Sequence, residues 1–170
     1  MFERVSTLSC CPDFNPDLWD DRFFIWENKN VIVESVCTFF YLPMNLNRVL
    51  KRIHVLLERN HIKNPDNLYL REYVSFWRMN IYVPVDNSVP CMENRSMCGR
   101  FYGKVFREDI QHKVKWLEYF RNRLKEEGYI SKQLYRWYPK CTKCIRKGEI
   151  NYVVYLAQVL PADMYHSIGS

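Results

Sequence analysis

Residues 23–60 read FFIWENKNVIVESVCTFFYLPMNLNRVLKRIHVLLERN, and they set the expected architecture. The first half holds two runs of β-branched and aromatic residues around the turn-forming cluster ENKN, which predicts a β-hairpin. In the second half Asn45 is suited to an N-cap, and six apolar residues follow at helical spacing. They are Leu46, Val49, Leu50, Ile53, Leu56 and Leu57. The segment therefore predicts strands followed by an amphipathic helix.

The same order returns later in the chain. Residues 68–85 predict one long or two short strands, and after a polar loop GRFYGKVF (99–106) begins a second cycle. A helix from Ile110 to Glu127, with Asp109 as cap and Gly128 as stop, precedes a hairpin of residues 129–138 and 150–159. The prediction is an α+β fold of duplicated strand-helix-strand-strand modules. Its mostly antiparallel curved sheet carries two helices on one face, which leaves the other face for a ligand cleft.

Composition limits the class of protein. A chain of 170 residues predicts an N-terminal arm (1–22), one domain (23–160) and a C-terminal tail (161–170). The hydrophobic share of 48% excludes a mostly disordered chain. The net charge of +6 is spread without a dense Lys/Arg run, so nucleic acid is not an expected partner. With no signal peptide and no 18-residue apolar run, we expect a cytoplasmic monomer or homodimer that does not bind membranes.

Strand alternation points to an acid among apolar neighbours. In VIVESVCTFF (31–40), Glu34 shares a face with Ile32, Val36 and Phe40. One interpretation is a solvated residue on a half-exposed strand. The other is a partly desolvated carboxylate that pairs with a cation or transfers a proton. The remaining acids considered, Glu72, Asp86 and Glu149, are expected to be surface charges or turn residues.

The sequence has seven cysteines and no secretion signal, which favours reduced thiols or metal ligands over disulfides. Cys141 and Cys144 form a Cys-x-x-Cys within the turn expected between two strands. If two loops meet, Cys91 and Cys98 could complete a four-thiolate zinc site. A redox role fits less well, because that motif opens a helix after a strand. The simplest interpretation is two thiols in a basic turn.

One stretch resembles a known family. GRFYGKVFREDIQHKVKWLEYFRNRLKEEGYISKQLYRWY (99–138) is similar to the second half of the GyrI-like family, and the twofold strand-helix-strand-strand order matches as well. The resemblance implies a pseudo-twofold sheet with a central cleft for bulky cationic or aromatic molecules. Some relatives are effector domains of transcription regulators, and others resemble hydrolases of cyclopropane-bearing natural products. This chain departs in lacking a helix-turn-helix and in carrying the Cys-x-x-Cys, and the acidic position cannot be matched residue by residue.

These observations predict a protein that binds a hydrophobic, aromatic or cationic small molecule, and they leave open whether it only binds this molecule or also hydrolyses it. Glu34 would activate water or protonate the leaving group, while Tyr82 stabilises developing negative charge. The expected cleft walls are Trp77, Tyr82, Tyr102, Trp137, Tyr152 and Phe40, although large aromatics can instead belong to the core. No cofactor is expected apart from a structural zinc. The alternative is a zinc-stabilised adaptor protein that uses the basic Cys-x-x-Cys hairpin.

Overall fold

Two modules with the same element order make up the protein. The computed structural model describes residues 11–107 and 113–165. The first module consists of β1 (Arg22–Phe39), α1 (Leu46–Arg59), β3 (Leu70–Tyr73) and β4 (Arg78–Pro84). The second consists of β5 (Glu93–Arg107), α2 (Lys113–Glu126), β6 (Tyr129–Trp137) and β7 (Tyr152–Pro161). Four short elements accompany the modules: η1 (Pro16–Leu18), β2 (Leu42–Pro43), α3 (Thr142–Arg146) and α4 (Ala162–Tyr165). The predicted order of strand, helix, strand and strand, repeated once, is confirmed.

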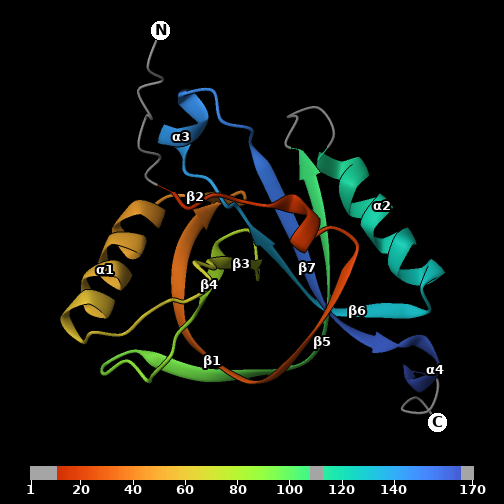
Figure 1. Ribbon diagram of the computed structural model, residues 1–170, viewed down its shortest axis with the longest axis horizontal. Coiled ribbons are helices and arrows are strands. Elements are labelled where there is room, and N and C mark those ends of the chain that lie inside the picture. Colours follow the sequence, from red (N-terminus) through yellow and green to blue (C-terminus); the bar gives the residue numbers. More distant parts are fainter. Residues whose placement is uncertain (1–10, 108–112, 166–170) are drawn as a thin grey trace, which may run out of the picture.

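The sheet curls into a ring because the two modules pair at both ends. Strand order is β1-β4-β3 in the first module and β5-β7-β6 in the second, so the modules share one internal arrangement. They meet where Arg71 of β3 lies opposite Arg136 of β6, and again along the β1–β5 ladder. Every pairing between the described strands is antiparallel. The prediction of an α+β fold with a mostly antiparallel curved sheet is confirmed (Figure 1).

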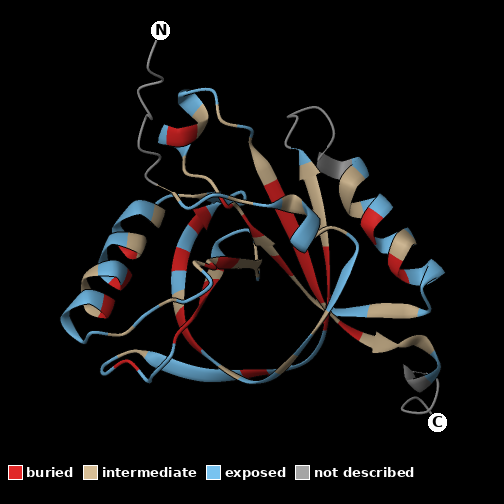
Figure 2. Ribbon diagram, in the orientation of Figure 1, coloured by how far each residue is buried: buried red, intermediate tan, exposed pale blue. Residues whose placement is uncertain are grey.

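Residues alternate between the inside and the outside of this ring. Inward side chains such as Val33, Phe101 and Leu156 form one buried cluster. Outward residues of β1 and β4 pack under α1, on the buried helix positions Val49, Ile53 and Leu57. A third cluster joins β5 and β7 to Phe120 and Leu124 of α2. Buried residues therefore lie along the strands and on the inward sides of α1 and α2 (Figure 2). The helices cover the outer surface, which leaves the interior of the ring as the place for a site.

Three local predictions were wrong. ENKN does not form a hairpin, because β1 continues through it with a β-bulge between Trp26 and Lys29, where Asn28 has φ +50°. Turn-forming residues also suit a bulge, so composition alone does not distinguish the two. The predicted polar loop before residue 99 is partly strand, since β5 begins at Glu93. The connection between β6 and β7 is not a simple turn but contains α3. The predicted cap Asp109 lies outside the described residues.

The N-terminal segment covers one end of the ring. Trp19 packs on Trp137 of β6 with ring centroids 5.0 Å apart, and Phe14 contacts Trp137 at 5.4 Å. Gly103 of β5 permits this close approach, because a Cβ at that position would lie 2.8 Å from the carbonyl oxygen of Trp19. That distance is too short for a side chain of any size. The segment is therefore part of the packed structure from Cys11 onward.

Candidate functional site

A hollow of about 270 Å³ opens into the ring. The part of β5 that lines it is the stretch from Arg95 to Phe101. The buried rings of Tyr82, Phe101 and Tyr135 form its inner wall, together with Met97. Its polar lining includes Arg95, Lys132, Gln133 and Gln158. Because β4, β5, β6 and β7 all contribute residues, the hollow depends on closure of the ring. It combines an apolar interior with a few polar groups, as small-molecule sites do.

Glu72 adjoins this hollow and is fixed by two of its lining residues. Its Oε2 accepts a hydrogen bond from the hydroxyl of Tyr82 (2.7 Å), and its Oε1 accepts one from Nε2 of Gln133 (2.6 Å). Glu72 lies opposite Asn80 and Leu70 lies opposite Tyr82 in the β3–β4 pairing, which places all four residues on the inward face. The prediction that Glu72 is a surface charge was wrong. Its half-buried side chain is held in place but can still reach solvent.

Burial and neighbouring charge keep the two tyrosines of the hollow neutral. Burial raises the pKa of Tyr82, and its hydrogen bond to the Glu72 carboxylate raises it further. Burial also raises the pKa of Tyr135, to which the charges of Tyr82 and Glu72 add. Arg95, which is hydrogen-bonded to Glu93, has a raised pKa and stays cationic. The hollow thus offers the Tyr135 hydroxyl as a donor, the Glu72 carboxylate and the Arg95 guanidinium.

Glu34 does not line the hollow. It lies on the outer face of β1 with Ile32 and Val36, and it forms an ion pair with Arg52 of α1. The alternation that placed Glu34 among apolar residues was correct, but that face is the one covered by the helix. The acid that adjoins the hollow is Glu72 in β3 of the same module, not Glu34.

The predicted wall residues are distributed over four places. Tyr82 alone among them lines the hollow. Tyr102 is buried on the outer face near Phe120 of α2, while Trp137 and Tyr152 contact Phe14 at the covered end of the ring. Phe40 and Trp77 are 61% and 58% exposed, in a separate aromatic cluster. The structure therefore does not bring the six aromatics into one cleft.

Tyr102 takes part in a charged network that predicts a pH effect. Its hydroxyl donates to Asp21, which also accepts from Nζ of Lys104 at 2.8 Å. Partial burial raises the pKa of Asp21, but the hydrogen bonds from Lys104 and Tyr102 outweigh it and hold the pKa below its ordinary value of 3.8. A lowered pKa in the folded state adds stability that is present above pH 3.8 and is lost as the pH falls through the folded value.

We expect Asp21→Asn to lower Tm at neutral pH and to lose that disadvantage in acid. The difference in Tm between wild type and variant should stay constant well above pH 3.8 and shrink as the pH falls below that value, because protonation then removes the same charge from the wild type. Thermal unfolding across this range measures the effect, with Asp163→Asn near the C-terminal end of β7 as the comparison. A constant difference at all pH values would contradict the assignment.

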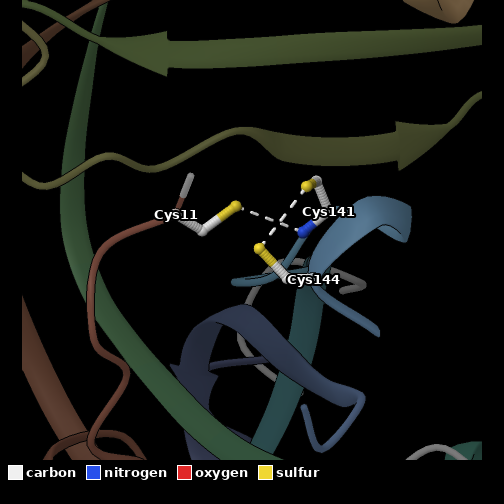
Figure 3. Close-up of side chains that lie close together, drawn as sticks. All are labelled: Cys11, Cys141 and Cys144. Atoms are coloured by element: carbon white, nitrogen blue, oxygen red, sulfur yellow. Dashed lines mark hydrogen bonds between the residues drawn. The ribbon is translucent and has the colours of Figure 1, made fainter. Parts of the chain in front are cut away.

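Three thiols meet between the N-terminal segment and the β6–β7 connection. The Sγ atoms of Cys11, Cys141 and Cys144 all lie within 4.8 Å of one another, and they point toward a common centre (Figure 3). Burial raises the pKa of the Cys11 thiol to about 12. Cys141 and Cys144 were predicted metal ligands, and the geometry could accommodate a metal. The predicted partners Cys91 and Cys98 are exposed and lie outside this cluster, whereas Cys11 was not predicted.

Comparison with known proteins gives one family assignment. The family model described as "Bacterial hydrolase" matches residues 1–159. No curated protein matches the chain. Among the helices of the described residues, none has the length and apolar character needed to cross a membrane.

Proposed function

The chain belongs to the bacterial hydrolase family, and we propose that its hydrolytic site is the hollow inside the ring. The observation that carries this proposal is the Glu72 carboxylate, held between Tyr82 and Gln133 at the edge of the hollow. Hydrolysis requires a group that accepts a proton from water, and a carboxylate fixed by two hydrogen bonds is suited to this task. Each of its oxygens accepts one described hydrogen bond and retains a lone pair for a water molecule.

In the proposed reaction Glu72 removes a proton from a water molecule as the oxygen attacks an electrophilic carbon of the substrate. Arg95 and a tyrosine hydroxyl stabilise the negative charge that develops on the substrate. The bond to the leaving group then breaks, and protonated Glu72 returns the proton to the leaving atom. The raised pKa of Tyr135 supports this scheme, since its hydroxyl keeps its proton, whereas the proton of Tyr82 is already donated to Glu72.

The lining favours an aromatic or apolar substrate without positive charge. Phe101 and Tyr135 offer ring faces, while Arg95 and Lys132 would repel a cation. Of the ligand types predicted from sequence, the cationic one therefore receives least support. The volume suits a molecule at the small end of the usual range for ligand sites. A GyrI-like relationship is part of the proposal and is supported by the equal strand order of the two modules.

A panel of chromogenic aromatic esters, lactones and epoxides tests the proposed activity. In a reducing buffer, as expected for a cytoplasmic protein, the purified protein should hydrolyse at least one neutral aromatic compound of the panel with saturable kinetics. The matched variant is Gln158→Trp, which narrows the hollow and replaces none of Glu72, Tyr82 and Gln133. It should lose most of the activity and keep its circular dichroism spectrum. Full activity in this variant would show that hydrolysis occurs elsewhere.

The zinc-stabilised adaptor is the second candidate, and the thiol cluster is the observation that favours it. In that case the hollow would have no catalytic role, and the panel would give no turnover. Basic residues of α3, Lys143 and Arg146, would form the recognition surface. Pull-down of an acidic peptide library by wild type but not by Lys143→Glu would support the adaptor.

A further inference from the structure

We propose that Cys11, Cys141 and Cys144 bind a zinc ion that fastens the N-terminal segment over the end of the ring. This site is separate from the hollow and does not depend on the proposed hydrolysis. Cys141 Sγ and Cys144 Sγ lie 3.7 Å apart. Sulfurs at about 2.3 Å from a tetrahedral zinc ion are about 3.8 Å from each other, so the thiols already have the spacing of a zinc site.

The same geometry is unlike that of a disulfide, in which the sulfurs lie about 2.05 Å apart. All three thiols are sheltered, and Cys144 is only 1% exposed. The backbone N–H of Cys141 donates to Sγ of Cys11 at 3.3 Å, so a hydrogen bond already joins the N-terminal segment to the N-cap of α3. Three thiolates occupy three positions of a tetrahedron and leave the fourth to water or another donor.

Closing this site would connect segments that are 130 residues apart in sequence. Cys11 immediately precedes the stretch in which Phe14 and Trp19 cover Trp137. Cys141 and Cys144 belong to α3 and its N-cap, just beyond the end of β6 that carries Trp137. A metal ion here would therefore hold the N-terminal segment in place through its bond to Cys11, in addition to the apolar contacts of Phe14 and Trp19.

Zinc content of the purified chain tests this inference. We expect about one zinc per chain in wild type, and a lower Tm after treatment with a chelator. Both features should be lost in Cys11→Ser and in Cys144→Ser, and both should persist in Cys37→Ser, which removes an exposed thiol elsewhere. If a serine variant fails to fold, cobalt substitution of wild type still decides, since tetrahedral thiolate coordination gives strong visible bands. Metal-free wild type with a Cys141–Cys144 disulfide, or zinc retained by both cluster variants, would overturn the proposal.

A second observation concerns the surface. An exposed aromatic patch joins the β1–β2 turn to the β3–β4 turn and comprises Phe39, Phe40, Tyr41, Leu42, Phe76 and Trp77. The rings contact one another, with centroids 5.6 Å apart for Phe40 and Trp77 and 4.7 Å apart for Tyr41 and Phe76. Backbone hydrogen bonds from Thr38 to Trp77 (2.8 Å) and from Tyr41 to Phe76 (3.2 Å) tie the two turns together. Exposed apolar patches of this kind mark interaction sites.

The charges near the patch identify the kind of surface that it fits. The sequence has no acidic residue between Glu34 and Glu58 or between Glu72 and Asp86, whereas Arg48, Lys51 and Arg78 are exposed there. A symmetric contact between two copies would bring these like charges together. Aromatic side chains beside cations instead suit the interface of a bilayer with anionic headgroups. We infer that this patch docks the protein onto an anionic lipid surface.

Flotation with vesicles tests the lipid inference. The protein should float with vesicles of phosphatidylcholine and phosphatidylserine but not with phosphatidylcholine alone, and added salt should weaken the binding. The variant Phe40→Ser/Trp77→Ser should stay unbound, while Leu18→Ser/Ile25→Ser, which alters exposed apolar residues elsewhere, should bind as wild type. Absence of binding by wild type, or a change only from dimer to monomer in the patch variant, would overturn it.

Discussion

Replacing Glu72 with glutamine should lower kcat by about 100- to 10,000-fold on any substrate that the protein hydrolyses, with little change in KM. Glutamine keeps the size of the side chain. With its carbonyl oxygen in the place of Oε1 it still accepts from Gln133, and its NH2 group can donate to the Tyr82 hydroxyl. It cannot accept a proton from water, so the loss falls on the chemical step. Steady-state kinetics on the most active ester or lactone measures the effect.

Two comparison variants make this result specific. Glu34→Gln tests the acid predicted from the sequence. Because Glu34 pairs with Arg52 on the outer face, we expect its replacement to leave kcat close to wild type. Tyr82→Phe tests whether Glu72 acts only by positioning the tyrosine. Equal losses in Tyr82→Phe and Glu72→Gln would assign catalysis to the hydroxyl, and a loss in Glu34→Gln alone would reject the hollow as the site.

Local sequence patterns were sufficient to predict the strands and helices of the two modules, but not that the modules close into a ring. The spacing of Val49, Ile53 and Leu57 predicts the buried face of α1, because helical periodicity depends only on near neighbours. The ring depends on the contact of β3 with β6 and on the β1–β5 ladder, which join residues far apart in the chain. No periodicity within a strand carries that information. The sequence therefore predicts a curved sheet and two helices, and leaves the interior of the ring unforeseen.

The missed acid had the same signal as the predicted one. Leu68, Leu70 and Glu72 alternate toward one face, as Ile32 and Glu34 do in β1. Glu72 lies in the segment 68–85 that predicts strands, yet the expectation for it was a surface charge or a turn residue. Alternation predicts which residues share a face, but not whether a helix or the interior of the ring lies against that face. Only the three-dimensional pairing separates Glu72 from Glu34.

The missed thiol shows a different limit. Cys141 and Cys144 are recognisable as a pair because only two residues lie between them, whereas Cys11 lies near the other end of the chain. Cys91 and Cys98 were the expected partners on the assumption that two loops meet. In the structure Cys98 lies in β5 and borders the hollow instead. A metal ligand that is distant in sequence, such as Cys11, can be identified only when it is known which two segments of the chain meet.

Phe101→Ala should have the largest effect on stability, a loss of about 3–5 kcal/mol and a fall in Tm of about 10 °C. Phe101 is fully buried inside the ring, where its ring centroid lies 4.3 Å from that of Trp26 and 6.5 Å from that of Tyr135. It thus links the bulged part of β1 to β6 across the interior. Truncation would leave a cavity next to the existing hollow, and strands from both modules would lose contact with each other.

Urea unfolding followed by tryptophan fluorescence measures this loss, and Phe76→Ala is the matched comparison. Phe76 is 50% exposed and lies outside the ring, so its removal should cost less than about 1 kcal/mol. The β3–β6 and β1–β5 contacts join the two modules, so we expect them to unfold together. Phe101→Ala should then lower the urea concentration at the midpoint and leave a single unfolding transition. A two-step transition would show that the modules fold independently, and an effect as small as that of Phe76→Ala would contradict the packed interior from which the hollow opens.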